Sequence, residues 1–382
     1  MALAQPDLLE TATHATELRA CAGPSVRSVI FYPFGLIKFL MKKTHSFWLA
    51  LLAFFPLSSM AQEPNTRAAF LKLIDRQRVA LEPVVEKRPD IDGLTQERFT
   101  FAAEKQERVP GILLKKAGSE RQPVVVVLHG TGGTKEGQLS VLTTLANQGF
   151  VAVAIDGRYH GERQTGTGSA RYVEAILQTY RTGKGHPFLY DTVWDVMRLI
   201  DYLETRPDVD AARIGVMGFS KGGMETYLTA AVDPRIAVAV PLIGVQSFGW
   251  ALDHELWMSR VGTFQAAIDA AAKDEGVANV DAAFVRKFYD RVVPGIYTQF
   301  DGPAMLPLIV PRPLLIINGD SDARTPLPGL MDCMTPTEQA YRKVNAEDKL
   351  KLYLQKDTGH LVTPVGLQMA VDWLVKHLIN SK

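Results

Sequence analysis

The sequence predicts an α/β protein with a mostly parallel central sheet, helices on both faces of the sheet, and an inserted helical cap. Continuous apolar runs, such as Val-Val-Val-Val-Leu at 124–128, are typical of strands buried on both faces. Segments with helical periodicity alternate with these runs along most of the chain. The alternation breaks at 244–305, where only helical patterns occur, so we interpret this segment as the cap.

The size and composition fit an ordinary globular protein. The chain has 382 residues, of which 47% are hydrophobic and 22% are charged, enough for one large domain with an insertion or for two domains. The formal net charge of +1 gives no electrostatic reason to expect nucleic acid or an anionic membrane surface as a partner. The two cysteines, Cys21 and Cys333, form neither a disulfide framework nor a metal-ligand cluster.

The amino-terminal part contains a pattern typical of a secretory signal peptide. In residues 41–61 two lysines precede an apolar run at 47–57, and small residues follow, so we expect cleavage after Ala61. This predicts an exported protein with no membrane anchor after cleavage. Because the signal starts at a methionine, our hypothesis is that residues 1–40 are an upstream extension absent from the natural product. The alternative is a membrane-anchored protein with its anchor at 29–57, a stretch that several basic residues interrupt.

The coarse pattern divides the rest of the chain into a helical lead-in, 62–98, and a main domain, 99–382, that contains the cap. Strands are expected at 99–103, 109–114, 123–128, 151–155, 214–217, 237–242, 314–318 and 351–354. Helices are expected at 66–84, 136–147, 172–180, 191–205 with Asp191 as its N-cap, from Ser220 to 231, 335–344 and 364–379, and in the cap at 250–260, 264–272 and 282–292. A connector is expected at 88–93.

The segment Gly218-Phe-Ser-Lys-Gly222 joins an expected strand to an expected helix. This is the spacing of a nucleophile elbow, in which a serine stands at the tip of a tight strand-to-helix turn. Glycines on either side of Ser220 leave room where a Cβ atom would clash. The start of the following helix offers unpaired N–H groups to an oxyanion. The alternative reading of Ser220 is an ordinary helix N-cap.

Four motifs occur in the chain order expected of one superfamily: His-Gly-Thr-Gly-Gly at 129–133, the elbow at 218–222, Gly-Asp-Ser-Asp at 319–322 and Thr-Gly-His at 358–360. With them the chain, from about residue 99 to the end, resembles the α/β-hydrolase superfamily. Within it the chain is similar to the branch that holds dienelactone hydrolases, acetyl xylan esterases and prolyl-oligopeptidase-type catalytic domains. The resemblance implies the hydrolase chemistry but not the substrate.

The resemblance implies a Ser-His-Asp triad with Ser220 as nucleophile. His360 follows the last expected strand and precedes the last helix, so it is the expected base. The family pattern places the acid three residues after a glycine and four before a proline, and Asp322 has this spacing. The competing carboxylate, Asp320, is then interpreted as a turn residue that bonds its own backbone.

An oxyanion hole is expected from the backbone N–H of Lys221 and, in the loop after the third strand, that of Thr131. His129, which starts this loop, is interpreted as a structural hydrogen-bonding residue. For the side chain of Lys221 we expect a solvated ammonium group, with contact to an anionic substrate group as the alternative.

Candidates for substrate binding are Arg158 and His160 at the end of one strand, and Trp250, His254 and Trp257 in the cap. Arg158 and His160 are also compatible with a salt-bridged loop that ties the cap to the body. The two tryptophans lie at helical spacing, where aromatic residues often belong to the core.

These observations predict an exported serine hydrolase that cleaves small-molecule or carbohydrate carboxylic esters through an acyl-enzyme, with neither metal nor organic cofactor. A serine peptidase would share the triad, but such enzymes carry a large accessory domain, and only 62–98 precedes the main domain here. A non-catalytic binding module with the same fold is the third reading. The intact set of Ser220, Asp322 and His360 argues against it.

Overall fold

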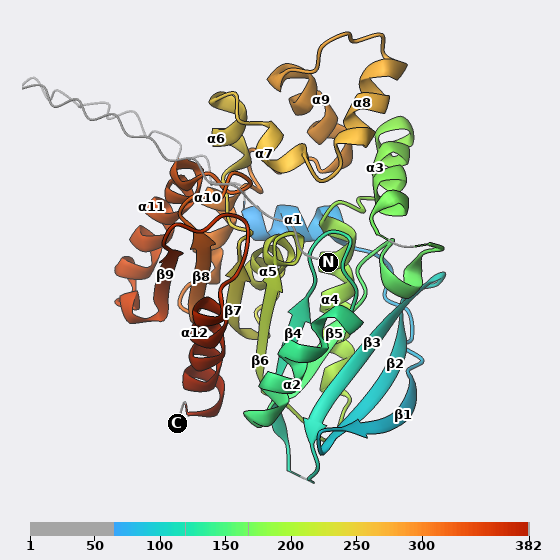
Figure 1. Ribbon diagram of the computed structural model, residues 1–382, viewed down its shortest axis with the longest axis vertical. Helices are drawn as coiled ribbons and strands as arrows, with labels where there is room; N and C mark the ends of the chain where they lie inside the picture. Colours follow the sequence, from blue (N-terminus) through green and yellow to red (C-terminus); the bar gives the residue numbers. More distant parts are fainter. Residues whose placement is uncertain (1–64, 119, 167, 381–382) are drawn as a thin grey trace, which may run out of the picture. The chain divides into compact units, whose positions relative to one another are not determined.

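The computed structural model describes residues 65–118, 120–166 and 168–380, and the expected extension at 1–40 and signal peptide at 41–61 lie outside these ranges. A nine-stranded sheet forms the centre, with the strand order β1-β2-β3-β5-β4-β6-β7-β8-β9 (Figure 1). The strands are β1 (Val84–Ile91), β2 (Leu94–Glu104), β3 (Glu107–Lys116), β4 (Gln122–Leu128), β5 (Val151–Ile155), β6 (Val209–Phe219), β7 (Ile236–Leu242), β8 (Leu314–Gly319) and β9 (Leu350–Gln355).

The sheet is parallel from β5 to β9 and antiparallel from β1 through β3 to β5. In the parallel part of the sheet, apolar and polar residues do not alternate along a strand, and the run of valines in β4 shows the reason. Val124 and Val126 pack into the core on one face of the sheet, whereas Val125 and Val127 pack into the core on the other. Both faces are therefore covered, as expected for a parallel sheet.

Helices cover the two faces unequally. On one face α2 and α12 complete the core, and on the other α1, α4, α5 and α11 do so (Figure 1). The helices are α1 (Thr66–Ile74), α2 (Leu139–Asn147), α3 (Ala170–Thr182), α4 (Tyr190–Glu204), α5 (Lys221–Val232), α6 (Phe248–Asp253), α7 (Met258–Val261), α8 (Gln265–Asp274), α9 (Ala282–Val292), α10 (Gly302–Met305), α11 (Leu327–Lys343) and α12 (Pro364–Leu374).

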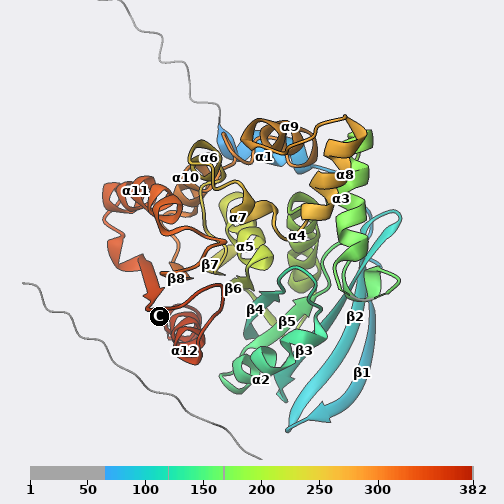
Figure 2. The same cartoon turned by 45° about the horizontal axis from the view of Figure 1, so that its top comes forward.

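The segment expected to form the cap, 244–305, consists of the five helices α6 to α10 with connecting loops. Helix α3, which comes from a different part of the chain, packs against α8 and α9, and Figure 2 shows the three side by side. The cap therefore includes a helix that the chain order alone does not assign to it.

A single carboxylate holds the cap together at its base. Asp301 accepts four hydrogen bonds, from the hydroxyl of Ser247 at 2.9 Å and from the backbone N–H groups of Phe248 at 2.8 Å, Gly249 at 2.8 Å and Gly302 at 2.7 Å. Because Asp301 is 4% exposed, these donors replace its hydration shell. It thereby joins the starts of α6 and α10.

The expected helix at 66–84 is wrong in its second half. Helix α1 ends at Ile74, and β1 occupies Val84–Ile91, so 88–93 is strand and turn instead of a connector and the lead-in 62–98 is only partly helical. β1 is an edge strand, and all but one of its residues are exposed. Its charged sequence therefore lacks the alternation that a half-buried strand shows.

Two further expectations need correction at helix ends. Helix α11 begins at Leu327, eight residues before the expected start, because it tolerates Pro328 in its first turn and Pro336 in its interior. The N-cap of α4 is Leu189 instead of Asp191. The carboxylate of Asp191 accepts hydrogen bonds from the backbone N–H of His186 at 3.1 Å, so it closes the preceding loop.

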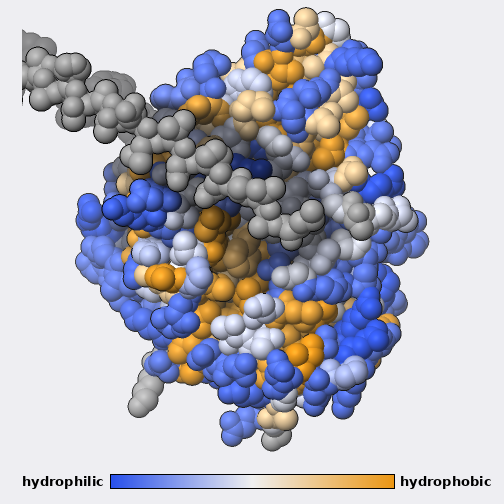
Figure 3. Space-filling model, in the orientation of Figure 1, coloured by the Kyte–Doolittle hydropathy of each residue, from blue (hydrophilic) through white to orange (hydrophobic). Residues whose placement is uncertain are grey.

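The surface in Figure 3 is mixed. Apolar side chains gather over the region of α2 and α12, and hydrophilic side chains surround them (Figure 3). In the part of the chain that the structure describes, no helix is both long enough and apolar enough to span a bilayer.

Candidate active site

Ser220 stands at the junction of β6 and α5, the position of a nucleophile elbow. Its backbone is strained, with φ 54° and ψ −109°, in a region that non-glycine residues rarely adopt. The N–H of Ser220 donates a hydrogen bond of 2.9 Å to the carbonyl of Leu242 on the neighbouring strand β7, which fixes the turn.

The two elbow glycines are required by backbone contacts. A Cβ atom on Gly218 would lie 2.3 Å from the carbonyl oxygen of Gly222. A Cβ atom on Gly222 would lie 2.3 Å from the carbonyl oxygen of Leu128, at the end of β4. Because both obstacles are backbone atoms, no side-chain movement could make room. The tight packing keeps Ser220 against the loop that follows β4.

Ser220, His360 and Asp322 lie in one hydrogen-bonded chain. The Nε2 atom of His360 is 2.8 Å from the Oγ atom of Ser220, and its Nδ1 atom is 2.7 Å from Oδ2 of Asp322. An ionised carboxylate can only accept, so Nδ1 carries the proton and Nε2 is left to accept the proton of the serine hydroxyl. The fold brings together residues that are 140 positions apart in the sequence.

Asp322 is held as a carboxylate in a nearly closed site, with 2% of its surface exposed. It also accepts hydrogen bonds from the hydroxyl of Thr325 at 2.5 Å and from the backbone N–H of Arg324 at 2.8 Å. Burial alone would raise the pKa of Asp322, but the hydrogen bonds from His360 and Thr325 and the attraction to His360 outweigh it and lower the pKa.

Asp320 faces away from the imidazole. Its carboxylate accepts hydrogen bonds from the backbone N–H groups of Asp357 at 3.1 Å and Thr358 at 3.2 Å, in the loop that carries His360. The expectation that it bonds its own backbone therefore omits its main contacts. A Cβ atom on Gly319 would lie 2.1 Å from the carbonyl oxygen of Thr358, so the two loops pack backbone to backbone.

The loop after β4 lies beside the nucleophile. A Cβ atom on Gly130 would lie 3.6 Å from the Cβ atom of Ser220. His129 donates from Nδ1 to the carbonyl of Gly130 at 2.7 Å and accepts at Nε2 from the N–H of Gly157 at 3.0 Å. Burial, and then the positive charge of Lys221, lower the pKa of His129 well below its usual value, so it is a neutral structural residue.

The two expected oxyanion donors belong to this loop and to the elbow. Thr131 is partly exposed in the loop, one residue beyond Gly130. Lys221 is the first residue of α5, and an amide at this position has no carbonyl partner within its own helix.

The arrangement has the parts that acyl transfer requires: a serine hydroxyl, a hydrogen-bonded imidazole that can take its proton, and a carboxylate that orients the imidazole. Comparison with known proteins identifies the family. The model of the dienelactone hydrolase family matches residues 109–360, which is more than half of the chain. The chain belongs to the dienelactone hydrolase family. The resemblance inferred from the four motifs is thereby confirmed, and the protein is a hydrolase with the α/β-hydrolase fold.

Relatives of this family member include the protein YtaP of Bacillus subtilis (strain 168), named as a hydrolase. It is 27% identical over 286 residues, which cover 71% of this chain and 84% of YtaP. A 4-O-methyl-glucuronoyl methylesterase of Wolfiporia cocos is 26% identical over 183 residues, or 47% of this chain and 43% of that protein.

Among solved structures, the acetyl xylan esterase from Paenibacillus sp. R4 has a TM-score of 0.60 and 19% identity, and the match covers 83% of this chain and 96% of that one. Acetyl xylan esterase 1 from Thermoanaerobacterium sp. JW/SL YS485 has a TM-score of 0.59 and 18% identity, with 82% and 94% covered. At such identities these likenesses establish the fold alone.

In this hydrolase the side chain of Lys221 contradicts both expectations for it. The ammonium group is 2% exposed, and it forms an ion pair of 2.7 Å with Glu225, one turn further along α5. It lies 5.9 Å from the ring centre of Tyr172 and therefore points into the protein, beneath the elbow. Neither solvent nor a substrate bound at Ser220 is its partner.

Arg158 is also unsuited to substrate binding. It is 8% exposed and forms a two-pronged ion pair with Asp195 of α4, both bonds being 2.9 Å, and it also pairs with Glu104 of β2. The alternative interpretation, a salt-bridged loop, therefore fits Arg158 better than substrate binding does, but the elements that the loop joins differ from those expected. The ion pairs of Arg158 join the loop to β2 and α4, both of which belong to the body.

His160 is fully buried and does not reach the site surface. Its Nδ1 atom donates to the carbonyl of Arg158 at 2.7 Å, and its ring packs 4.7 Å from that of Tyr172 and 5.0 Å from that of His129. Burial, and then the charge of Lys221, lower the pKa of His160 to about 3. The expected role in substrate binding is wrong, because the loop turns this ring inward.

The cap candidates remain at the surface. Trp250 packs against Gly329, where a Cβ atom would lie 3.0 Å from its ring, and stacks on the exposed ring of His254 with 4.2 Å between centres. Trp257 is half-buried and contacts the main core. Their part in substrate binding stays a prediction.

Arg260 in α7 is a further candidate that the sequence did not indicate. Its guanidinium group is buried between the cap and the body, donates to the carbonyl oxygen of Arg324, and lies 3.6 Å from the sulfur of Met224. No spacing or motif marks this residue, because its environment is created by cap packing.

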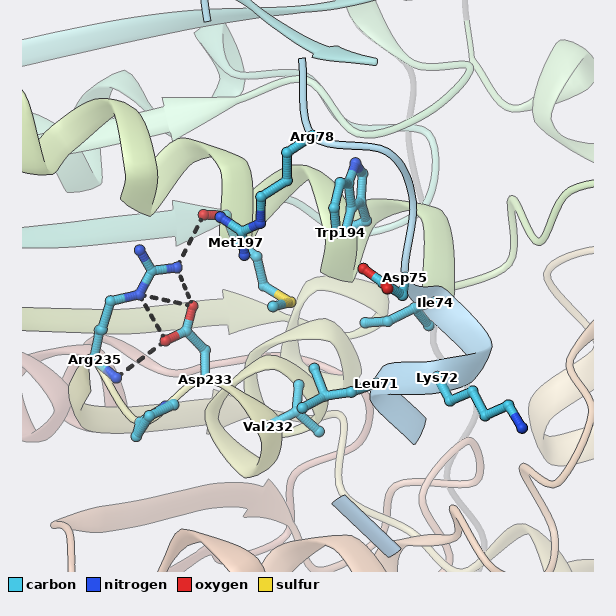
Figure 4. A pocket seen from close by; sticks show the side chains of 11 residues that line it. Leu71, Lys72, Ile74, Asp75, Arg78, Trp194, Met197, Val232, Asp233 and Arg235 are labelled. Atoms are coloured by element: carbon cyan, nitrogen blue, oxygen red, sulfur yellow. Dashed lines mark hydrogen bonds and ion pairs between the residues drawn. The ribbon is translucent and has the colours of Figure 1, made fainter. Parts of the chain in front are cut away.

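A separate cavity of about 470 Å³ lies between α1, α4 and the α5–β7 connection (Figure 4). Trp194, Met197 and Val232 form its apolar wall, and Figure 4 shows the guanidinium of Arg235 turned toward the carboxylate of Asp233. This connection follows the carboxyl end of α5, whereas Ser220 precedes its amino end. The cavity is therefore distinct from the candidate active site.

Proposed function

We propose that this member of the dienelactone hydrolase family is an exported serine hydrolase that cleaves carboxylic esters through an acyl-enzyme. One observation carries the proposal: the Oγ atom of Ser220 is 2.8 Å from Nε2 of His360, whose Nδ1 atom is 2.7 Å from the buried carboxylate of Asp322. A serine hydroxyl becomes a nucleophile when such a base accepts its proton.

In the first half-reaction, Ser220 attacks the ester carbonyl carbon while His360 takes the hydroxyl proton at Nε2. Asp322 stabilises the imidazolium, which donates hydrogen bonds from both nitrogens. When the tetrahedral intermediate collapses, the bond to the alcohol oxygen breaks and His360 returns the proton to this oxygen. In the second half-reaction His360 takes a proton from water as the water oxygen attacks the acyl carbonyl carbon. The bond from this carbon to Oγ of Ser220 then breaks, His360 returns the proton to Oγ, and the carboxylic acid leaves.

The proposed oxyanion donors are the backbone N–H groups of Lys221 and Thr131. The first is at the start of α5, where the helix dipole also favours negative charge. The second belongs to the loop whose Gly130 approaches Ser220 to ordinary contact distance. His129 supports this loop with its two hydrogen bonds. Because its imidazole is neutral, it carries no positive charge that would attract the oxyanion away from these N–H donors.

For the substrate we propose a small-molecule or carbohydrate ester. The names of the methylesterase and xylan esterase relatives suggest such esters. The cap is the proposed specificity element, and Trp250 and Trp257 are two of its partly exposed aromatic side chains. The same relay could hydrolyse amides, so a peptidase is the rival to test.

The experiment is to treat the purified protein with a fluorophosphonate probe and to measure turnover of acetylated sugars, short p-nitrophenyl esters and aminoacyl amides. We expect labelling of Ser220 and hydrolysis of esters, with both lost in Ser220→Ala. Ser140→Ala, at an exposed position of α2, is the matched control for handling and folding and should keep both activities. A folded protein that neither labels nor hydrolyses any ester would overturn the proposal, and faster turnover of amides than of esters would make it a peptidase.

Export is proposed from residues 41–61, which have the pattern of a signal peptide. Expression in a bacterial host with fractionation should give mature protein that starts at about Gln62 in the exported fraction. Replacing the two lysines before the apolar run by glutamate should slow this processing. An uncleaved chain in the cytoplasm would contradict the proposal without affecting the esterase assignment.

A further inference from the structure

Arg260 is a buried cation without a carboxylate partner. Only 6% of its surface is exposed, and it forms no ion pair with any carboxylate of the described residues. Its contacts are the carbonyl oxygen of Arg324 at Nη2 and the thioether sulfur of Met224, a weak acceptor, at Nη1. The Nε atom is buried and has no hydrogen-bond partner. The guanidinium thus keeps unused donors at Nε and Nη1.

Other buried or half-buried arginines of the described residues have more partners. Arg198 also has a buried Nε atom without a partner, but its guanidinium forms an ion pair with Asp201 and donates to the carbonyl of Val79. Arg158 makes a two-pronged ion pair with Asp195. Arg312 has no carboxylate partner, but its three nitrogens donate to four backbone carbonyls: those of Ile309, Asp233, Ile236 and Ala230. Arg260 therefore differs from these arginines in having neither an ion pair nor several carbonyl acceptors, and a buried charge is costly unless it is paired.

The position of Arg260 relates it to the candidate active site. Met224 lies one helical turn beyond Ser220, and its backbone N–H donates to the carbonyl of Ser220 at 3.0 Å. Arg324 lies two residues beyond Asp322 and donates its own N–H to that carboxylate at 2.8 Å. The guanidinium of Arg260 therefore sits between the helix that carries the nucleophile and the loop that carries the acid.

The local charges do not neutralise Arg260. The exposed side chain of Arg324 adds a second positive charge, and it also forms no ion pair among the described residues. Asp322 attracts the guanidinium, but its oxygens already accept from His360, Thr325 and the backbone. Burial lowers the pKa of Arg260 to about 10, which still leaves it charged at neutral pH.

Two further polar atoms near this position lack partners. The Oε1 atom of Gln246 and the hydroxyl of Tyr227 are both buried without a hydrogen bond. The side-chain amide of Gln246 is bonded to the hydroxyl of Ser259, which neighbours Arg260, at 3.0 Å. The hydroxyl of Tyr227 is close enough to influence the charge of Arg260. One of these atoms, the amide oxygen of Gln246, is an acceptor, and the hydroxyl of Tyr227 can donate or accept, so the polar groups around the guanidinium are incompletely paired.

We propose that Arg260 binds a carboxylate group of the substrate, so that the preferred ester carries one negative charge in addition to its scissile bond. This proposal rests on the proposed esterase function. A guanidinium group matches a planar carboxylate through two parallel hydrogen bonds, which a neutral ester group cannot form as strongly. The side chain of Met224 is flexible, so it would move away from Nη1 when the carboxylate binds there. Because the residue belongs to α7, the cap itself would recognise the charge.

The first test compares esters that differ only in charge. In the first pair the charge is on the acyl side: mono-p-nitrophenyl glutarate is the charged ester and p-nitrophenyl valerate the neutral one. In the second pair the charge is on the alcohol side: the acetate ester of 4-hydroxyphenylacetate is charged, and the acetate ester of 4-methylphenol is neutral. We expect the kcat/KM ratio of charged to neutral ester to exceed about 10 in one pair. The ratio should fall at least tenfold in Arg260→Met and less in Arg260→Lys. Arg88→Met, on the exposed edge strand β1, is the matched control and should keep the wild-type ratio.

A second test measures binding without turnover. Glutarate should raise the Tm of the wild-type protein, of Ser220→Ala and of Arg88→Met, but not that of Arg260→Met, and the neutral glutaramide should raise none. If the esterase proposal fails, turnover is absent in every variant while this glutarate effect persists. The Arg260 proposal is overturned if the neutral ester is preferred in both pairs, if Arg260→Met keeps the wild-type ratio, or if glutarate stabilises Arg260→Met as it does the wild type. If Arg260→Met does not fold, Arg260→Lys is the deciding variant. A lower kcat/KM ratio of charged to neutral ester and a smaller rise in Tm with glutarate support the proposal, and wild-type values of both overturn it.

Discussion

The carboxylate of Asp320 accepts a hydrogen bond of 3.2 Å from the backbone N–H of Thr358. It thereby joins the loop after β8 to the loop that presents His360. Asp322, two residues away, instead directs its carboxylate to the imidazole at 2.7 Å. The two aspartates of Gly-Asp-Ser-Asp therefore have different partners: Asp320 is bonded to the histidine loop, and Asp322 is bonded to the imidazole of His360.

Exchange of each aspartate for asparagine should separate the roles of these two contacts. Asp322→Asn should lower kcat by about 10⁴-fold, because an amide in this place can stabilise the wrong tautomer of His360. Asp320→Asn keeps one carbonyl acceptor for the histidine loop, and kcat should fall by less than about tenfold. Steady-state ester hydrolysis by the two variants measures both effects. Equal losses would show that Asp322 is not the catalytic acid.

Removal of the Ser220 hydroxyl should lower kcat by about 10⁶-fold, and adding His360→Ala to Ser220→Ala should cost little more, because the triad acts as a unit. The strain belongs to the backbone at φ 54°, so alanine retains it whereas glycine relieves it. Ser220→Gly should therefore be more stable than Ser220→Ala by about 1 kcal/mol. Thermal and urea unfolding of the two variants measure this difference, and equal stabilities would mean that the elbow is not strained.

Gly222→Ala should lower the free energy of unfolding by more than about 3 kcal/mol, because the new Cβ atom would meet the carbonyl oxygen of Leu128. Its calculated separation of 2.3 Å can be relieved only by moving α5 away from β4. Gly137→Ala is the control, since its Cβ atom would meet nothing closer than 3.9 Å. Urea unfolding should show near-neutral stability for the control. A Gly222→Ala variant as stable as wild type would refute the close packing at the elbow.

His160 should make the protein sensitive to acid. Its pKa is about 3 in the folded protein and near 6.5 when unfolded, so between these values the unfolded chain binds the extra proton. The stability from neutral His160 is therefore complete above about pH 6.5 and is lost as the pH falls toward 3. His160→Asn keeps a donor for the carbonyl of Arg158 and removes the titration.

Urea unfolding between pH 6 and 4 tests this expectation. Relative to the wild type, His160→Asn should reduce the loss of stability by about 1.4 kcal/mol per pH unit. The exposed His254→Asn is the control and should keep the wild-type slope. An unchanged slope in His160→Asn would mean that this imidazole is accessible to protons in the folded state.

The sequence alone was sufficient for eight of the nine strands of the sheet, all except the edge strand β1, and for the residues proposed as a triad. Buried parallel strands need apolar side chains on both faces, so β4 and β5 appear as continuous apolar runs. The elbow needs glycine where backbones touch, so Gly218 and Gly222 mark it locally. The order of the serine, aspartate and histidine motifs follows from strand order, because each residue stands at the carboxyl end of a parallel strand. Such signals are contained in short stretches of chain.

Only the tertiary structure decided which partners each charged or polar side chain has and whether it is buried. Lys221 follows the nucleophile directly, yet its ammonium group is buried against Glu225, and Arg158 is tied to Asp195 of α4. Asp301 became the anchor of the cap, and Arg260 a buried cation, only when separate helices packed around them. The free energy of a charge depends on its burial and its partners, and both come from residues distant in sequence. Local spacing therefore identified the residues proposed to perform the chemistry, whereas long-range packing determined which charges remain free to meet a substrate.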